Sequence, residues 1–451
     1  MTNTNLKRFK SLMVCFFMGS FIPINASMGT HFEFLENKKR QKVDFELINN
    51  LIVLPVEVNG QKLHFLLDSG VNTTLVFNNN QLQNPKLDDA KQVMLQGLGD
   101  GNPVVAHITT GNTLKIKHLV AEQQTILLID ETEFEFAKRM GTQIDGILGY
   151  SLFSSALITV NYETEQIKFQ KFEHQPKRIC RQCYEIPIEI HDNKPYIQLS
   201  GKLSTYLPIE GKFLVDSGSG DSIWLFPHSE AVDIIEPVFE DFLGRAINGN
   251  IFGQRGKITS MNIGEKTFQG VKVAYPNEEN LKHLSILEGR IGSIGGEILR
   301  RFRVTFDYQN KKIYFKPLRR HQRPFYYNMS GLEIQHNGVE LIRTKLTNNL
   351  GIKTSDDRQV SGVEVFLQPQ FQLELIPVIE IFEVRPESPA AKVGVQPGDI
   401  LKRINGTPVS RLKISDIINK LQKKPGQKLR IVVERKNRML KFNFVLEPLF
   451  G

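Results

Sequence analysis

Two stretches of the chain carry nearly the same six residues, and this internal repeat constrains the fold more than any other feature. Residues 65–70 read FLLDSG, and residues 213–218 read FLVDSG. A second pair of blocks, residues 145–169 and 291–315, aligns without a gap. The offset is 148 positions between the two Asp residues and 146 positions between the two blocks. Because two different motifs recur in the same order at nearly the same distance, the sequence predicts tandem copies of one lobe.

Short β segments dominate each copy. Apolar residues 51–58, a turn at Asn59-Gly60 and residues 63–67 are typical of a hairpin that leads into Asp68. Helical patterns are sparse, so both copies are expected to be all-β lobes. The chain has 451 residues, of which 40% are hydrophobic and 9% aromatic, which favours folded cores and about three domains. The two lobes are expected at residues 45–172 and 186–318.

The repeated strings bring one carboxylate each to the end of an apolar strand. A single Asp-Ser-Gly string is most often an ordinary turn, because all three residue types favour turns. A matched pair within a repeat favours a dyad formed by Asp68 and Asp216. Two carboxylates held about 3 Å apart cannot both ionise, so they share one proton, and one acts as a base while the other acts as an acid. Asp68 and Asp216 are therefore the candidate catalytic residues.

With these motifs the chain resembles the aspartic peptidases, and more narrowly the retropepsin-like lobe used twice in one chain, over about residues 45–318. The resemblance implies two retropepsin- or pepsin-like β-barrel lobes, each with an apolar-apolar-Gly segment that supports the Asp loop. These segments would be residues 147–149 and 293–295, and the second departs from the pattern at Ser293. The implied reaction is hydrolysis of peptide bonds by a water that the dyad activates, without a metal or another cofactor. The residues implied to support the dyad are Ser69, Gly70, Ser217, Gly218 and Ser219.

The two strings differ in the residue that follows each Gly. Ser219 can donate a hydrogen bond to Asp216 and so favour its ionised form, whereas Val71 cannot do this for Asp68. We therefore expect Asp68 to hold the shared proton more of the time.

The family also covers its cleft with a glycine-rich hairpin. The best candidate lies in residues 97–103, where the expected flap residues are Gly97, Leu98, Gly99, Asp100 and Gly101. Such a glycine content suits a mobile lid. The matching region of the second lobe is residues 248–253, for which a plain β-turn is an equal alternative.

The pattern changes after residue 318. Ser388 is a predicted N-cap, Pro389 the first helical residue and Gly394 the stop, and a turn, a strand and another turn follow over residues 395–406. This order resembles a bacterial PDZ domain, expected at residues 331–451. The resemblance implies that an extended peptide adds as a strand in a groove between residues 378–384 and the helix at 414–421. The alternative is a structural module docked on the second lobe.

The amino terminus is typical of a secretory signal peptide. Basic residues precede an apolar stretch at residues 12–24, and cleavage is expected after Ala26, with an uncleaved membrane anchor as the alternative. In an exported protein Cys180 and Cys183 are expected to form a disulfide, because the context for a redox or zinc site is lacking. The expected location is the periplasm or cell envelope of a bacterium, with no stable membrane span once residues 1–26 are removed.

The charge of the chain gives little information about partners. The formal net charge of +9 falls to about +6 without residues 1–26. Basic runs at residues 38–40 and 319–323 are explained as solvated linkers more simply than as a nucleic-acid surface. Protein or peptide substrates, and a peptide in the PDZ groove, are the expected partners. The competing hypothesis is a non-catalytic envelope protein that binds peptides with a protease-like fold. A PDZ-bearing serine peptidase is disfavoured because no motif for its nucleophile is present.

Overall fold

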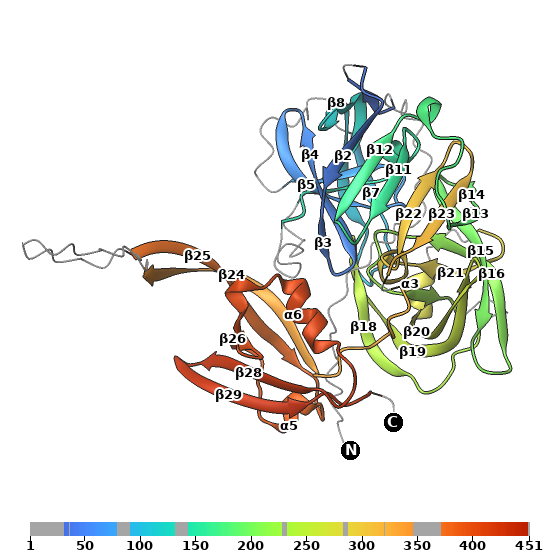
Figure 1. Cartoon of the computed structure of the whole chain (residues 1–451). Helices are drawn as coiled ribbons and strands as arrows, with labels where there is room; N and C mark the ends of the chain where they lie inside the picture. Colours follow the sequence, from blue (N-terminus) through green and yellow to red (C-terminus); the bar gives the residue numbers. More distant parts are fainter. Residues whose placement is uncertain are drawn as a thin grey trace, which may run out of the picture.

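The computed structural model describes residues 31–35, 37–78, 91–130, 143–227, 232–282, 287–319, 321–345 and 371–449. The expected signal peptide lies outside this part of the chain. The described residues form a mainly β protein, in which two lobes lie side by side and a separate domain follows at the carboxy terminus (Figure 1). Within these ranges no helix is both long and apolar enough to cross a bilayer.

Lobe 1 contains nine strands in one sheet: β1 (Glu33–Phe34), β3 (Glu46–Ile48), β4 (Leu51–Val58), β5 (Gln61–Leu67), β6 (Thr74–Asn78), β7 (Lys91–Leu95), β8 (Val104–Ile116), β9 (Leu119–Asp130) and β10 (Gly146–Leu148). The predicted hairpin before Asp68 is confirmed, since β4 and β5 pair antiparallel around Asn59 and Gly60, which both have positive φ. Strand β10 pairs parallel with β5 and antiparallel with β6. It therefore fixes the strand that leads into Asp68.

Lobe 2 contains eight strands in one sheet: β14 (Glu189–His191), β15 (Lys194–Lys202), β16 (Pro208–Val215), β17 (Ile223–Leu225), β18 (Phe239–Ala246), β19 (Gly249–Ile263), β20 (Lys266–Pro276) and β21 (Arg290–Ile294). Strand β21 pairs parallel with β16 and antiparallel with β17, as β10 does with β5 and β6. The short helices beside the two lobes are α2 (Tyr150–Phe153), α3 (Glu278–Leu281) and α4 (Gly296–Leu299). The strand leading into Asp216 is thus fixed as in lobe 1.

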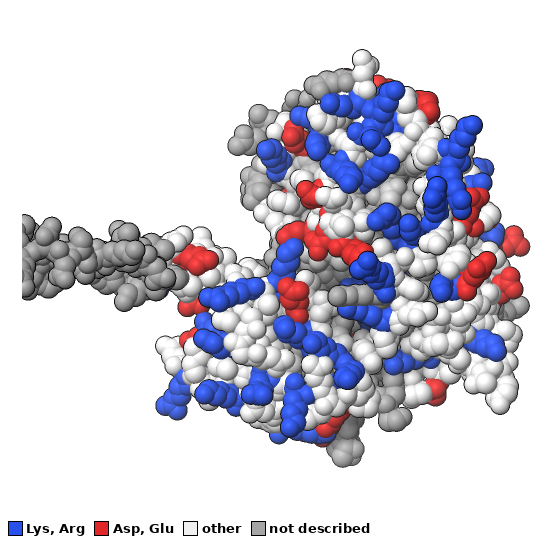
Figure 2. All heavy atoms as spheres, viewed as in Figure 1, with Lys and Arg blue, Asp and Glu red and all other residues white. Residues whose placement is uncertain are grey.

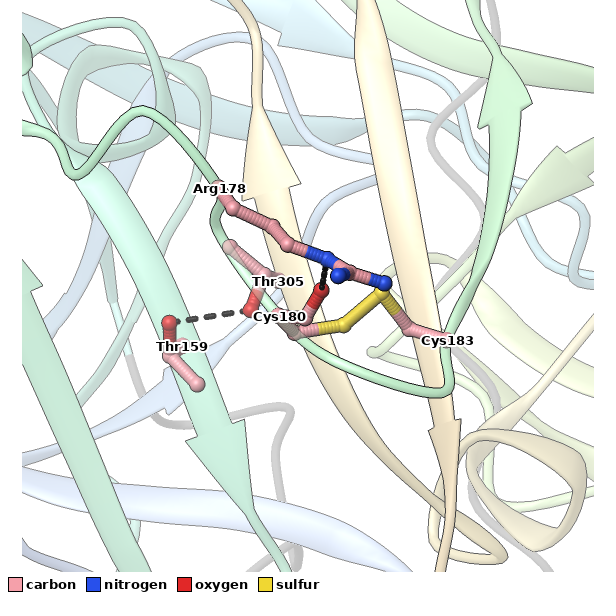
Figure 3. Close-up of a disulfide and its surroundings, with 5 residues drawn as sticks. All are labelled: Thr159, Arg178, Cys180, Cys183 and Thr305. Carbon is pink, nitrogen blue, oxygen red and sulfur yellow. Dashed lines mark hydrogen bonds between the residues drawn. A yellow bond between two sulfur atoms is a disulfide. The ribbon is translucent and has the colours of Figure 1, made fainter.

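A six-stranded sheet joins the lobes: β2 (Arg40–Asp44), β11 (Leu157–Asn161), β12 (Gln166–Gln170), β13 (Tyr184–Pro187), β22 (Phe302–Asp307) and β23 (Lys312–Pro317). At its centre β11 pairs with β22, and the Thr159 and Thr305 hydroxyls lie 3.0 Å apart in a hydrogen bond (Figure 3). These two residues are 146 positions apart and match in the repeat. Strand β2 precedes residue 45, so the sheet includes chain before the expected start of lobe 1.

The linker between the lobes contains the short helix η2 (Phe172–His174) and the disulfide between Cys180 and Cys183 (Figure 3). The Arg178 side chain lies against it and donates from Nε to the carbonyl oxygen of Cys180 at 3.2 Å. The disulfide closes a turn at the point where the chain enters β13.

Both lobes share one continuous hydrophobic core. It includes Phe153 of lobe 1, whose ring centroid lies 5.0 Å from that of Phe306 and 5.4 Å from that of Tyr308, both of lobe 2. The apolar residues flanking the Asp loops are buried, as expected from the sequence: Leu66, Leu67, Leu75, Val76, Leu214, Val215, Ile223, Trp224 and Leu225. Because the core crosses the lobe boundary, the position of one Asp loop is fixed relative to the other.

The carboxy-terminal domain is a six-stranded sheet with three short helices: β24 (Leu332–Lys345), β25 (Phe371–Val384), α5 (Pro389–Lys392), β26 (Asp399–Ile404), β27 (Thr407–Pro408), η3 (Val409–Arg411), α6 (Ile414–Leu421), β28 (Lys428–Arg435) and β29 (Arg438–Val445). The predicted cap is confirmed, since Ser388 Oγ accepts a hydrogen bond from the Ala391 amide at 3.3 Å. The predicted helix at 414–421 is confirmed as α6. The domain has its own core, with Ile381, Leu401 and Ile417 fully buried.

The predicted place of the peptide groove is wrong. Residues 378–384 of β25 pair with β24 on one edge, and β26 pairs with the other edge, so this strand has no free edge for a ligand. Within the described chain, no strand pairs with the outer edge of β24. The groove lies instead between the start of β24 and α6, lined by Leu332, Ile334 and Ile418. The error arose because the sequence around residues 332–365 shows no clear strand pattern.

Candidate active site

The two Asp loops meet between the lobes, and each is anchored by its supporting strand. Asp68 follows β5, and its amide donates to the Leu148 carbonyl of β10 at 2.9 Å. Asp216 follows β16, and its amide donates to the Ile294 carbonyl of β21 at 2.9 Å. Both carboxylates are fully buried. The two side chains are therefore positioned by equivalent sheet contacts in the two lobes.

A reciprocal set of hydrogen bonds locks one loop to the other. The Ser69 amide donates to Ser217 Oγ at 3.0 Å, and the Ser217 amide donates to Ser69 Oγ at 3.0 Å. Each hydroxyl then donates to a carbonyl of the opposite lobe, Ser69 to Val215 at 2.6 Å and Ser217 to Leu67 at 2.8 Å. These bonds hold the carboxylates of the two loops together at the lobe boundary.

The glycines of both loops bring the backbone close to the carboxylates. The Gly70 amide donates to Asp68 Oδ1 at 2.7 Å, and the Gly218 amide donates to Asp216 Oδ1 at 2.9 Å. A Cβ at Gly218 would overlap Asp68 Oδ2, so only glycine fits there. The Oδ2 atoms of Asp68 and Asp216 accept no hydrogen bond from any described residue. A proton shared between the two carboxyls would satisfy both of these oxygens.

The electrostatics of the pair favour retention of a proton. Burial, followed by the charge of Asp216, raises the pKa of Asp68 well above its ordinary value. Burial also raises the pKa of Asp216 to about 7, while the amides of Gly218 and Ser219 oppose this rise. Both shifts have the same direction, so the pair retains a proton as a unit, and the greater share for Asp68 stays a prediction. At residue 219 the backbone amide lowers the pKa of Asp216, whereas the prediction had relied on the Ser219 side chain.

Two hairpin turns, one from each lobe, are joined by hydrogen bonds. The expected flap residues lie in the turn between β7 and β8, and they meet the turn between β18 and β19. Asn248 Oδ1 accepts from the Gly99 amide at 2.9 Å, and its Nδ2 donates to the carbonyls of Gly99 at 3.1 Å and Gly101 at 3.0 Å. The Asp100 carboxylate accepts from the Asn250 amide at 2.8 Å. Both turns therefore form a hydrogen-bonded bridge between the lobes.

The two turns also exchange apolar side chains. In each sheet, the face that carries Asp68 or Asp216 has its own apolar cluster, named here the cleft-side cluster. The buried Leu98 of lobe 1 packs in the cleft-side cluster of lobe 2, and the buried Ile247 of lobe 2 packs in that of lobe 1. Leu98 and Ile247 are 149 positions apart, close to the repeat offset. Each turn thus packs an apolar side chain into the opposite lobe.

Replacing Asn248 by alanine is expected to loosen this bridge without unfolding the lobes. The change removes three hydrogen bonds, each of which contributes about 0.5–1.5 kcal/mol, so local opening rises by about tenfold or more. Hydrogen exchange at the Gly99, Asp100 and Gly101 amides measures the effect. Asn250→Ala is the matched control, because Asn250 binds the opposite turn through its backbone. Equal exchange in both variants would contradict a closing role for the Asn248 side chain.

A buried ionic cluster lies behind the Asp216 loop, and the sequence analysis did not identify it. The Arg255 guanidinium donates to Asp221 Oδ1 at 2.7 Å and to Asp241 Oδ2 at 2.6 Å. Asp221 also accepts from the Trp224 indole at 2.7 Å. All three charged side chains are at most 8% exposed. The cluster fixes the chain five residues after Asp216, and no regular spacing of its members in the sequence signals it.

The groove of the carboxy-terminal domain opens toward this same region. Asn50 of lobe 1 donates from Nδ2 to the Gly220 carbonyl at 2.7 Å, next to the Asp216 loop. Asn50, Arg300 and the groove residues Leu332 and Ile418 line one hollow that is partly open to solvent. Figure 2 shows the junction of the domain with the lobes as a recess bordered by acidic and basic side chains. A ligand in the groove would therefore lie close to the back of the Asp216 loop.

Comparisons with known proteins agree with both parts of this architecture. Residues 54–152 match the aspartyl protease family, and residues 380–435 match the PDZ domain family. None of the curated proteins matches the chain. Among solved structures, the aspartic proteinase from Irpex lacteus is 14% identical, with 62% of this chain and 98% of that chain covered at a TM-score of 0.42. The chain therefore carries an aspartyl protease-like domain followed by a carboxy-terminal PDZ domain.

Proposed function

We propose that the chain is an aspartic endopeptidase whose catalytic pair is Asp68 and Asp216. The observation that carries the proposal is the joint burial of two carboxyls with raised pKa values, held by reciprocal Ser69 and Ser217 hydrogen bonds. A structural role alone gives no reason to bury two carboxyls together, because burial disfavours their charged forms. Within the described residues, no group of three or more His, Cys, Asp or Glu side chains is placed to hold a metal ion.

The proposed mechanism is general acid–base hydrolysis. The ionised carboxyl, Asp216, takes a proton from a water molecule while the oxygen of that water bonds to the peptide carbonyl carbon. The protonated carboxyl, Asp68, donates its proton to the carbonyl oxygen, which gives a neutral tetrahedral intermediate. Collapse of the intermediate breaks the C–N bond, returns a proton from the new hydroxyl to Asp68 and passes the proton held by Asp216 to the leaving amine. The shared proton is thereby restored.

The PDZ domain is proposed to recruit a substrate or partner peptide into the groove between β24 and α6. Export to a bacterial envelope is part of the proposal, and it is supported by the signal-like residues 1–26 and by the Cys180–Cys183 disulfide. The competing function is peptide binding without cleavage. The full burial of both carboxylates favours this alternative.

The deciding experiment is cleavage of an unfolded protein substrate across acidic to neutral pH, with fragments identified by mass spectrometry. Wild type is expected to give internal cuts, and the double variant Asp68→Asn/Asp216→Asn is expected to give none. Absence of cutting by wild type, even with Asn248→Ala to open the turns, would favour the binding protein. Cutting by the double variant would assign the activity to other residues.

A further inference from the structure

Lobe 2 carries a cation beside Asp216, whereas lobe 1 carries an apolar residue at the matching place beside Asp68. The part of lobe 2 that carries Lys194, Arg290 and Asp216 is named here the lobe 2 wall. Strands β15 and β16 pair Tyr196 with Leu214. Two residues further along this antiparallel register, Lys194 lies opposite Asp216. The same step along β4 and β5 sets the fully buried Leu51 level with Asp68. This register sets Lys194 beside the dyad, and the charge of Lys194 lowers the pKa of both carboxyls.

A second cation lies in the same wall. Arg290 begins β21, and the repeat offset of 146 makes Ile144 its counterpart in lobe 1. The guanidinium carbon of Arg290 lies 5.6 Å from the Tyr196 ring centroid and 5.0 Å from that of Phe226. Only 4% of Arg290 is exposed, and its charge also acts on Asp216. Both positions that are apolar in lobe 1 are therefore cationic in lobe 2.

This wall faces the cleft. Side chains alternate between the two faces of a strand, so Leu214 and Asp216 share one face of β16 while Phe213 and Val215 face the common core. Tyr196, Phe226 and Leu214 belong to the cleft-side cluster of lobe 2, into which Leu98 inserts. Withdrawal of Leu98 would uncover Tyr196 and Phe226, over whose rings the Arg290 guanidinium lies.

Placing two like charges in this wall is unfavourable for the protein by itself. Burial, with the neighbouring Arg290 charge next in size, lowers the pKa of Lys194 to about 8, while Asp192 and the dyad oppose this shift. Asp192 lies in a turn with its side chain 59% exposed, so water screens its contribution. A dyad that holds one proton carries one negative charge beside the two positive charges of Lys194 and Arg290, and these cations attract an anion that enters the cleft.

We propose that Lys194 and Arg290 form an anion-binding subsite on the lobe 2 side of the cleft, which binds an Asp or Glu side chain of the substrate near the scissile bond. The inference rests on the proposed function and adds a substrate class to it. The lobe 1 side, with Leu51 and Ile144 at the matching positions, then takes an apolar side chain.

The test uses matched peptides that differ only by Glu or Gln at each position flanking the scissile bond. Wild type is expected to cut the Glu peptide with a kcat/KM about 10- to 100-fold higher at one position, as expected for a hydrogen bond between charged groups. Lys194→Met is expected to remove most of this preference, and Lys194→Glu to shift it toward a Lys peptide. Lys212→Met is the matched control, because Lys212 lies in the same sheet and pairs with the partly exposed Glu189 at 2.8 Å. It should keep the full preference.

Equal rates for Glu and Gln peptides at every position would overturn the subsite while leaving the peptidase intact. If wild type cuts neither peptide, the proposed function fails, and binding of the fluorescently labelled peptides to the same protein still decides the subsite. A preference for the Glu peptide in binding, lost in Lys194→Met, supports the subsite, and equal affinities for the two peptides overturn it.

The role of Arg290 is tested with two variants. Because Arg290→Met removes a buried side chain and could unfold the domain, Arg290→Lys is used beside it. It is expected to keep part of the preference, and a full preference in a folded Arg290→Met would exclude Arg290 from the subsite.

Discussion

Replacing Asp216 by asparagine is expected to lower kcat/KM for peptide cleavage by about 10²- to 10⁴-fold, the usual contribution of a positioned acid or base. Asparagine preserves the shape of the side chain and can still accept the Gly218 hydrogen bond, but it cannot take a proton from water. Asp68→Asn is expected to cause a loss of similar size, because the amide cannot transfer the shared proton. Rates on one peptide, together with thermal unfolding, measure the effect.

The control is Asp44→Asn, since Asp44 lies in the interlobe sheet and, among the described contacts, its side chain accepts a hydrogen bond only from the half-buried Gln166. This variant should cut at the wild-type rate. A dyad variant that keeps its melting temperature and also keeps full activity would contradict the mechanism.

The pH profile of the wild type follows from the same pair. The dyad titrates as a unit, and its active form holds one proton. Because burial raises the pKa of Asp216 to about 7, the pair loses its first proton only near neutral pH, whereas Asp68, whose pKa burial and the Asp216 charge raise well above its ordinary value, retains the shared proton there. The rate should therefore fall about tenfold for each pH unit below about 7, as Asp216 becomes protonated and can no longer take a proton from water. Activity confined to strongly acidic pH would contradict the raised pKa values.

Replacing Arg255 by methionine is expected to lower the free energy of unfolding by about 3–5 kcal/mol, the usual cost of leaving buried charges without their partner. Asp221 and Asp241 would lose a guanidinium that donates to both at 2.7 Å and 2.6 Å. Burial, and to a smaller extent the charge of Asp221, raises the pKa of Asp241, and Arg255 opposes that rise. Chemical denaturation at neutral pH measures the loss.

Two further variants separate charge from packing. Arg255→Lys keeps the charge but cannot reach both carboxylates as a planar fork does, so an intermediate loss is expected. Lys257→Met removes a half-buried cation from the same strand, β19. Burial, followed by the charge of Lys272, lowers the pKa of Lys257. Its expected effect is about 0.5 kcal/mol or less. An Arg255→Met protein as stable as Lys257→Met would show that the ionic cluster is not structural.

Local sequence predicted the structure correctly where a short pattern favours one backbone conformation. Asn59 and Gly60 permit positive φ and so specify the hairpin before Asp68, and Ser388 with Pro389 specifies the start of α5. The repeat went further, because matched residues at a constant offset occupy equivalent places. Thr159 and Thr305 meet in the interlobe sheet as a result.

Prediction from the sequence failed where the structure depends on which distant segment pairs with a strand or a turn. Residues 378–384 have the pattern of a ligand-binding strand, but pattern does not say which strand takes each edge, and β24 took the edge assigned to a peptide. The glycine-rich turn was recognised as a flap candidate, yet its contact with Asn248 joins residues 149 positions apart. Neither outcome can be read from neighbours along the chain.

The sequence alone therefore determined the two Asp-Ser-Gly loops as equivalent candidates, the β character of the lobes and the capped start of α5, because each depends on local propensity or on repetition. Only the tertiary structure decided that the loops lock together, that Leu98 and Ile247 cross between the lobes, and that Lys194 and Arg290 stand beside Asp216. These features depend on non-local packing, in which burial and charge act between residues that no spacing relates.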